Sequence, residues 1–436
     1  MFSFRFFIII SIVTLSPIVH SADILDIYNR ALKFNNDLKI ITNNNEISKE
    51  KYNQTSSSLF PDIGISASTQ EINTNKYNGS GTIGDYASET ATLRITQPLL
   101  RIYFFDELNK AEVNINKSQI EISSYKKDLI IRSAELYFSL INSNNKYKAE
   151  LIKNEIMSLK YNNAEKLFSN GYITDIELNK HRNNFNIANI ELDISLNELE
   201  LAKQDIYIFT GREALDIHNL NTVADIPFKN YDIELLISKA ITSFDSIKLA
   251  LLDVDISKHE MKSNRSQHYP TVDLIATYDY SDTSSGSRLG STTRESNTIG
   301  LTVNFPIYQG GFQSSKVEES RYKYENAKVS LDQLRRTIKR DIIDKVNNHN
   351  LLKKLIIANK NRYEDTNLDF ITTRNGLQSG LYTDVELKDS EYKLTIAKHK
   401  LISNTLKYLL MDLKLKKYSS ELSVESIKNI NQILIW

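Results

Sequence analysis

The sequence predicts a mainly helical chain made of two similar structural units, each combining long coiled-coil helices with a pair of β-strands. Two segments, FSNGYITDIEL and LQSGLYTDVEL, end at Leu178 and Leu387, so they are offset by 209 residues. Around both segments, apolar residues recur at spacings of three and four, which is typical of a coiled-coil seam. Between these stretches the spacing changes to two, which indicates strands. A single large repeat of this kind predicts two units placed side by side.

Each unit opens with a helical pattern that ends at an aromatic–proline pair. One helix is predicted over residues 23–58, and its counterpart over residues 231–267. Proline lacks the amide N–H and keeps the preceding residue extended, so the helices end before Pro61 and Pro270. Both prolines therefore mark the start of a strand pair.

Two strands of about ten residues follow in each unit, which is the length that a tilted membrane strand needs. Polar loops at residues 71–88 and 281–295 separate the strands, and the second strands end at Pro98 and Pro306. Apolar and polar residues alternate along each strand, as lipid-facing and lumen-facing positions require, although the edge of a soluble sandwich would show the same alternation. The residues predicted to face lipid are Ile63, Ile65, Leu93, Ile95, Val272, Leu274, Leu301 and Val303.

Four strands are too few to form a membrane barrel alone. Known membrane barrels begin at about eight strands, and an open strand edge is not tolerated in lipid. A membrane location therefore requires several chains to share one barrel.

A long helical hairpin completes each unit. In the first unit one helix is predicted over residues 108–168, a turn at Gly171, and a returning helix over residues 174–209. In the second unit the rising helix covers residues 316–377 and the turn lies at Gly380. At 1.5 Å per residue the first rising helix would be roughly 90 Å long.

The composition argues against several functional classes. The 54 Lys and Arg residues balance 54 Asp and Glu residues, and a net charge of zero argues against a nucleic-acid partner. The chain has no cysteine, which excludes thiol catalysis, cysteine-bound zinc and disulfides. Neither a phosphate-binding glycine loop nor an HExxH or G-x-S-x-G motif occurs. The sequence therefore predicts no enzyme, no cofactor and no metal site.

The N-terminus has the features of a secretory signal, residues 1–21. Arg5 supplies the positive charge, residues 6–15 supply a short apolar run, and cleavage is expected after Ser21. The run is shorter than the roughly 20 residues of a membrane-spanning helix. The remaining sequence divides into a first unit, a linker, a second unit and a polar tail, at residues 22–210, 211–230, 231–416 and 417–436.

Two repeats of helix, strand, strand and long helical hairpin behind a signal peptide resemble the TolC family of outer-membrane exit ducts. The resemblance covers nearly the whole mature chain and is carried by the strand ends QPLL and FPIYQGG and by the hairpin turns GYIT and GLYT. It implies a homotrimer whose twelve strands close one barrel, with an α-helical tunnel that extends into the periplasm. The linker and the tail would form a belt around the middle of this tunnel.

The resemblance also implies the function and the partners. The trimer would sit among outer-membrane lipids and passively conduct secreted proteins or small toxic compounds. It would work with an inner-membrane ABC transporter or other pump, and with a periplasmic adaptor of the membrane-fusion type. The absence of an N-terminal cysteine points away from the lipid-anchored drug-efflux branch. The adaptor would dock at the hairpin tips, at Gly171, Thr174, Gly380 and Thr383.

In this family, acidic residues six and nine positions after the second hairpin glycine narrow the periplasmic entrance. These positions are Glu386 and Asp389, which are three residues apart and so share a helix face. Glu386 has an alternative role, because Thr383 and Glu386 form a capping-box pattern, as do Thr174 and Glu177. Asp389 has no capping role. The family's locking Arg and Tyr are replaced by residues 382 and 377, a tyrosine and a leucine, so the lock must differ.

An exported structural protein is the alternative prediction. A coiled-coil surface protein or adhesin could use the same helices, with the strands as a soluble cap. Strands of membrane length with an apolar face, bounded by prolines, favour the channel.

Overall fold

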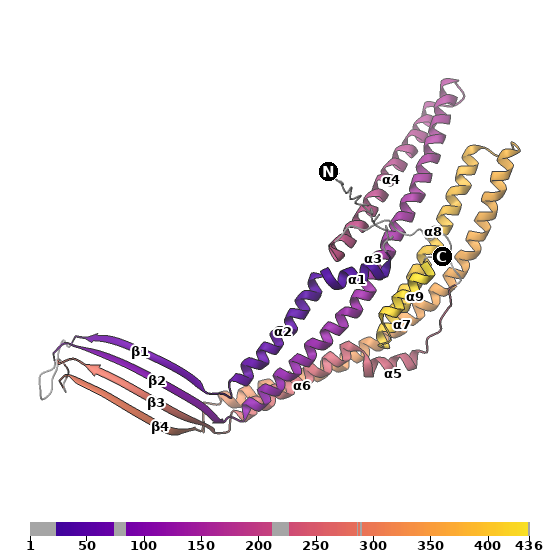
Figure 1. Cartoon of the computed structure of the whole chain (residues 1–436). Helices are drawn as coiled ribbons and strands as arrows, with labels where there is room; N and C mark the ends of the chain where they lie inside the picture. The colour runs from indigo at the N-terminus through magenta and orange to yellow at the C-terminus, as the bar shows by residue number, and fades with distance from the viewer. Residues whose placement is uncertain (1–22, 74–83, 212–225, 286, 288–289, 435–436) are drawn as a thin grey trace, which may run out of the picture.

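The computed structural model describes residues 23–73, 84–211, 226–285, 287 and 290–434. The predicted signal peptide with its cleavage site after Ser21, and most of the predicted linker, lie outside these residues. The described chain is elongated, with a four-stranded sheet at one end and the tips of two helical hairpins at the other (Figure 1).

The opening helix of each unit is broken in two, so the prediction of one continuous helix was wrong. The first break lies at Asn35, whose backbone is extended at ψ 120° and whose side-chain oxygen accepts a hydrogen bond from the Leu38 amide at 2.9 Å. An N-cap of this kind starts a new helix. The second unit breaks at the equivalent Phe244. The four helices are α1 (Ile24–Phe34), α2 (Asn36–Ser57), α5 (Ile233–Ser243) and α6 (Asp245–Ser266).

The four strands form one antiparallel sheet in the order β1-β2-β3-β4, and they are longer than predicted. The connecting segments are correspondingly shorter than the predicted loops 71–88 and 281–295. The second strand does not end at Pro98 but continues for two more residues, because a register shift between Pro98 and Leu100 accommodates the proline. The strands are β1 (Asp62–Ile72), β2 (Tyr86–Leu100), β3 (Thr271–Thr283) and β4 (Thr292–Asn304).

The long hairpins follow the predicted repeat closely. The helices α3 (Tyr103–Ser169) and α7 (Phe312–Gln378) both have 67 residues, and their ends are offset by 209 residues. Each is therefore roughly 100 Å long. The returning helices are α4 (Asp175–Thr210) and α8 (Asp384–Tyr418). Among the described residues, no helix combines the length and the apolar character needed to cross a membrane.

The helices pack as a single row with two free edges. Near the sheet the order of contacts is α2-α3-α6-α7, and near the tips it is α4-α3-α8-α7 (Figure 1). Only α3 and α7 run through both halves. One edge of the row is formed by α2 and α4, and the other by α7. The sheet also has two free edges, because β1 and β4 pair on one side only.

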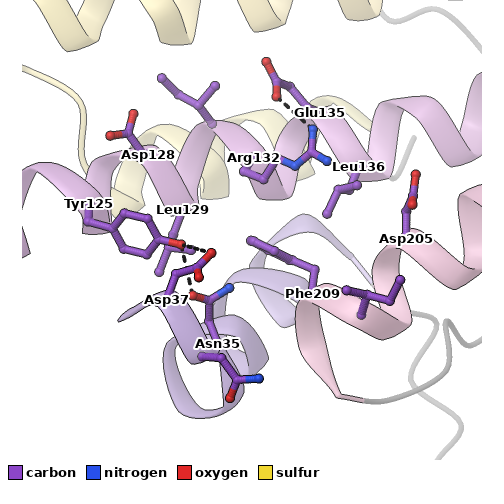
Figure 2. A pocket seen from close by; sticks show the side chains of 13 residues that line it. Asn35, Asp37, Tyr125, Asp128, Leu129, Arg132, Glu135, Leu136, Asp205 and Phe209 are labelled. Carbon is purple, nitrogen blue, oxygen red and sulfur yellow. Dashed lines mark hydrogen bonds and ion pairs between the residues drawn. The ribbon is translucent and has the colours of Figure 1, made fainter. Parts of the chain in front are cut away.

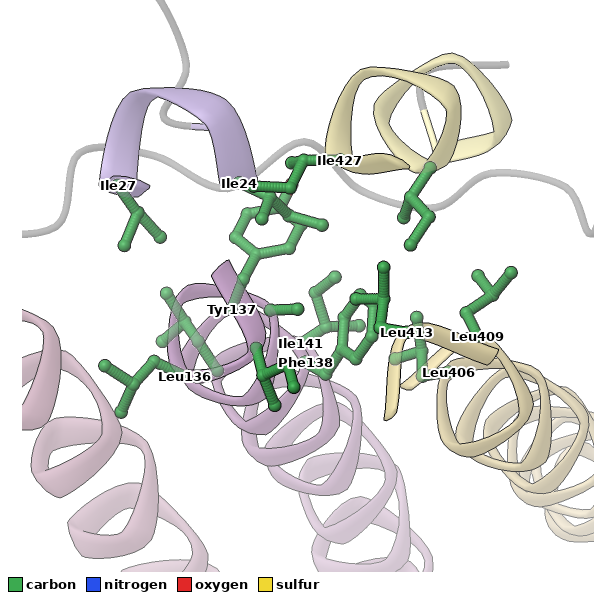
Figure 3. Packing of buried hydrophobic residues seen from close by; sticks show 14 of the residues in the cluster. Ile24, Ile27, Leu136, Tyr137, Phe138, Ile141, Leu406, Leu409, Leu413 and Ile427 are labelled. Atoms are coloured by element: carbon green, nitrogen blue, oxygen red, sulfur yellow. The ribbon is translucent and has the colours of Figure 1, made fainter. Parts of the chain in front are cut away.

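The main core lies at mid-length, where short helices cover the row. Ile24 of α1 and Ile427 of α9 (Val424–Leu434) pack over Tyr137 and Phe138 of α3 and over Leu413 of α8 (Figure 3). The segment predicted as a polar tail therefore contains a helix with a buried apolar face. A second core cluster joins α5 and α6 to α7.

Candidate functional site

All eight residues predicted to face lipid lie on one face of the sheet. Residues directly opposite each other in an antiparallel pair point to the same side. Leu93 on β2 is opposite Tyr278 on β3, which joins the two strand pairs into one continuous face. The cross-strand pairs are Ile63–Ile95, Ile65–Leu93, Val272–Val303 and Leu274–Leu301.

The opposite face of the sheet is polar. Its centre is held by a hydrogen bond from the Thr92 hydroxyl to the Asp279 carboxylate, at 2.8 Å. Arg94 follows Leu93 and Thr302 follows Leu301, so both lie on this polar face. The sheet therefore separates an apolar surface from a polar one, which is the arrangement of a strand between lipid and water.

The apolar band crosses the strands at an angle. On β1 it is centred on Ile65, whose level in the sheet passes through Leu93 and Tyr278 to Asn297 on β4. On β4 the band is centred on Leu301, four residues further along. This shift is about 13 Å along the strand over about 14 Å across three strand spacings. For the band to lie level in a membrane, the strands must tilt by roughly 40°, within the range of membrane barrels.

Each hairpin tip is a Schellman turn centred on a predicted glycine. Gly171 has φ +79° and Gly380 has φ +74°, in the left-handed region that glycine favours. At the first tip the Tyr172 amide donates to the Leu167 carbonyl at 2.9 Å, and at the second the Leu381 amide donates to the carbonyl of residue 376 at 2.9 Å. Both tips therefore reverse the chain with satisfied helix ends.

The tips expose apolar side chains. Tyr172 is 77% exposed, Ile176 is 82% exposed and Leu381 is 77% exposed. Thr174 and Thr383 cap the returning helices, so these apolar groups are held on a rigid turn. Rigid apolar groups on a small projecting surface suit docking of another protein.

The two predicted entrance carboxylates are each engaged within their own helix. Glu386 accepts hydrogen bonds from the Thr383 amide at 2.8 Å and from its hydroxyl at 2.9 Å, which completes the predicted capping box. The amide bond, followed by the hydroxyl bond, lowers the pKa of Glu386. Asp389 forms an ion pair with Lys393 at 2.9 Å. The structure thus supports the capping alternative for Glu386.

The capping box predicted at the first tip is only half formed. Thr174 accepts a hydrogen bond from the Glu177 amide at 3.3 Å. Among the described contacts, no bond returns from the Glu177 carboxylate to Thr174, so the reciprocal box is found at the second tip only.

The second tip has a contact that the sequence analysis missed. Gly376 packs against the ring of Tyr382, and a Cβ at Gly376 would lie 2.4 Å from the Tyr382 Cδ2 atom. The first tip has Leu167 and Ile173 at the equivalent positions. A glycine present in only one unit was the available signal. The Tyr382 ring therefore packs on its own hairpin.

A buried polar cluster joins α7 and α8 to residues 226–232. The Tyr231 hydroxyl donates to Asp412, and the Lys229 amide donates to the Tyr408 hydroxyl at 2.8 Å. His349 is fully buried and stacks on Tyr408 with ring centres 4.3 Å apart. Within the described residues, neither His349 ring nitrogen has a hydrogen-bond partner, and no group of His, Asp or Glu side chains is arranged to hold a metal ion.

Comparisons with known proteins agree with this architecture. The family described as "Outer membrane efflux protein" matches residues 236–419. The outer membrane protein TolC of Escherichia coli K12 is 22% identical over 428 residues, which cover 96% of this chain and 86% of that protein. The alkaline protease secretion protein AprF of Pseudomonas aeruginosa is 20% identical, covering 78% of this chain and 71% of that protein.

A solved structure shows the same fold. The CmeC outer membrane channel of Campylobacter jejuni superposes with a TM-score of 0.74 at 16% identity, covering 94% of this chain and 89% of that one. The matching family, the relatives that extend over nearly the whole sequence and the shared fold lead to one conclusion. The chain contains a domain of the outer membrane efflux protein family over residues 236–419 and is similar to TolC proteins over nearly its whole length.

Proposed function

We propose that three copies of this chain form an exit duct in the outer membrane, which passively conducts secreted proteins or small toxic compounds out of the cell. The observation that carries the proposal is that both the sheet and the helical row have two free edges in the single chain. The sheet ends at β1 and β4, and the helical row ends at α2 and α4 on one side and α7 on the other. Each edge can be completed by the opposite edge of another copy.

The number of copies follows from the need for a passage. An unpaired strand edge in lipid leaves backbone groups without partners, each costing several kcal/mol, so the sheet must close. Two copies would give eight strands, and a barrel of that size is filled by its own side chains. Three copies give twelve strands, with the polar face lining a lumen and the apolar face toward lipid. The tilt of roughly 40° derived from the apolar band supports this closure.

The helical part supports a tunnel on the periplasmic side. The helices α3 and α7 extend roughly 100 Å beyond the sheet, which is longer than a bilayer is thick. In this proposal the hairpin tips at Gly171, Thr174, Gly380 and Thr383 contact a periplasmic adaptor and, with it, an inner-membrane ABC transporter or other pump. Three copies of Asp389 would surround the threefold axis at the entrance. Glu386 would contribute there only if its carboxylate gave up its hydrogen bonds to Thr383.

The cargo class is supported by the names of relatives. They include an alkaline protease secretion protein, a proteases secretion protein and an outer membrane efflux protein. Protease secretion and efflux are therefore both represented among the relatives. None of these names describes an adhesin, and the apolar sheet face has no use in a soluble cap, so the channel is favoured over the structural alternative.

Native mass spectrometry and bilayer conductance test the proposal together. Protein extracted from outer membranes in mild detergent is expected to have the mass of three chains and to conduct ions in a planar bilayer. A matched sample of the same protein, heated to dissociate it, should lose both properties. A stable, non-conducting monomer from intact outer membranes would contradict the proposal.

A further inference from the structure

Arg94 lies on the polar face of the sheet at the middle height of the apolar band. The band is centred on Ile65 of β1 and on Leu301 of β4, and Ile65 is directly opposite Leu93 on β2. A straight line between the two centres crosses β2 about one residue beyond Leu93, which is at Arg94. If the apolar band lies in the bilayer, this arginine is therefore at mid-depth, on the side away from lipid.

Neither direct neighbour in the sheet covers the Arg94 side chain. Arg94 is exposed, and its partner on β1 is Gly64, which has no side chain. A Cβ at Gly64 would meet no atom within 4 Å. The partner on β3 is Thr277, whose hydroxyl donates a hydrogen bond to Asp279 at 3.0 Å. The guanidinium group therefore has open space above the polar face.

The charge of Arg94 is not neutralised by a bound carboxylate. Among the described residues, Arg94 has no ion-pair partner, and the two carboxylates diagonal to it in the sheet are Asp62 and Asp279. Asp279 accepts hydrogen bonds from the hydroxyls of Thr92 and Thr277, one on each oxygen, at 2.8 and 3.0 Å. Its hydrogen-bonding capacity is thus used by neutral partners, and the cation of Arg94 stays available.

Two other arginines show the contrasting arrangement. Where the sheet joins the helices, Arg101 binds both oxygens of Asp273, at 3.0 and 2.9 Å. In the pocket at the break between α1 and α2, Arg132 pairs with Glu135 at 3.5 Å (Figure 2). A nearby carboxylate thus neutralises an arginine in this chain where the geometry brings the two groups together, and at Arg94 it does not.

The charged residues of the polar face lie in separate layers. Asp62 is three residues from the band centre on β1, and Asp279 is about four residues from it on β3, so each is roughly 8–10 Å from the level of Arg94. This is about one Debye length at physiological salt, so each carboxylate is partly screened from the arginine. Arg294 lies seven residues beyond Leu301, about 18 Å farther from the helices at the tilt of roughly 40°.

We propose that Arg94 is a specificity-determining residue of the duct, where three copies form a cationic layer at mid-depth that attracts carboxylate and phosphate groups in transit. The inference rests on the proposed trimeric channel and adds a charge selection inside its barrel. A charge at mid-depth acts strongly because the surrounding low-dielectric wall concentrates its field in the lumen. Arg294 lies beyond the half-thickness of the hydrocarbon core, about 15 Å, so water and salt screen it at the mouth.

Reversal potentials in a KCl gradient test the sign of this layer. Trimers in planar bilayers are measured at low ionic strength, where screening is weakest. The Arg94→Gln variant is expected to raise the permeability ratio of potassium to chloride about two- to threefold, because a layer that favours anions is removed. Arg94→Lys keeps the charge and should keep the ratio. Arg294→Gln is the matched control, and it should change the ratio much less.

Block by inorganic tripolyphosphate tests whether the layer contacts an anionic group. Tripolyphosphate added at the barrel mouth is expected to reduce the current of the unmodified trimer. The blocking concentration should rise about tenfold in Arg94→Gln, because three exposed charge pairs are lost. It should rise little in Arg94→Lys and Arg294→Gln. Arg94→Thr, which resembles the threonines around it, is a second neutral variant should Arg94→Gln fail to insert.

The outcomes separate this inference from the proposed function. Conducting trimers in which both neutral variants leave the permeability ratio and the block unchanged would overturn the role of Arg94 and leave the duct intact. Equal effects of Arg94→Gln and Arg294→Gln would reject the mid-depth layer, because depth would then make no difference. Unmodified protein that forms no conducting trimer would overturn the duct itself.

Discussion

Charging the apolar sheet face is the most direct perturbation of the proposed channel. Leu301 lies at the centre of the apolar band on β4, is 65% exposed in the single chain and pairs with Leu274. An arginine near the bilayer midplane costs about 2–4 kcal/mol. Three copies would place three arginines in lipid, so Leu301→Arg is expected to disfavour the inserted trimer by about 6–12 kcal/mol.

Thr302→Arg is the matched control, because the adjacent residue lies at the same depth but points to the polar face. The assay is the yield of trimer in the outer membrane, together with refolding of purified protein into lipid vesicles. Leu301→Arg should abolish insertion, and Thr302→Arg should insert and alter conductance. Equal insertion of both variants would refute the argument that this face contacts lipid.

Three further perturbations test the helical part. Lys127→Met leaves Asp245 buried without its cation and should lower the free energy of unfolding by about 3–5 kcal/mol, as measured by denaturant titration. Burial lowers the pKa of His349, so the free energy of unfolding should fall as the pH drops below about 6.5, the ordinary pKa of histidine. The His349→Phe variant should show a flatter dependence of unfolding free energy on pH. Identical pH profiles of the two proteins would argue against this. Asp389→Ala should reduce cation selectivity in planar bilayers, and unchanged selectivity would remove Asp389 from the entrance.

The repeat was predictable because the apolar residues and the turn glycines recur at the same spacing in both units. Apolar periodicity and the glycine turns fix the long helices, and α3 and α7 begin and end at equivalent residues. What the sequence could not supply depends on three-dimensional context. Asn35 resembles an ordinary polar helix residue until its side chain is seen to cap Leu38. Pro98 ends a strand unless a register shift is available to absorb it.

The functional residues divide in the same way. The apolar face of the sheet follows from alternation alone, whereas its slant requires the register between β2 and β3. The capping pattern at Glu386 is visible in the sequence, but the choice between cap and entrance is decided by the bonds to Thr383. The buried cluster joins His349 to Tyr231, more than one hundred positions earlier, so no local sequence pattern predicts it.

Joining two units in one chain changes how the duct can assemble. In the proposed trimer six units close the ring, so a protein with a single unit would need six subunits, and each association would cost on the order of 4–15 kcal/mol of lost translational and rotational freedom. In that trimer half of the contacts between units would be intramolecular and would form at high effective concentration. Covalent linkage also frees the two kinds of contact to diverge. The contact within the chain holds Lys127 against Asp245 at 2.6 Å, whereas a contact between copies would form only after two chains meet by diffusion.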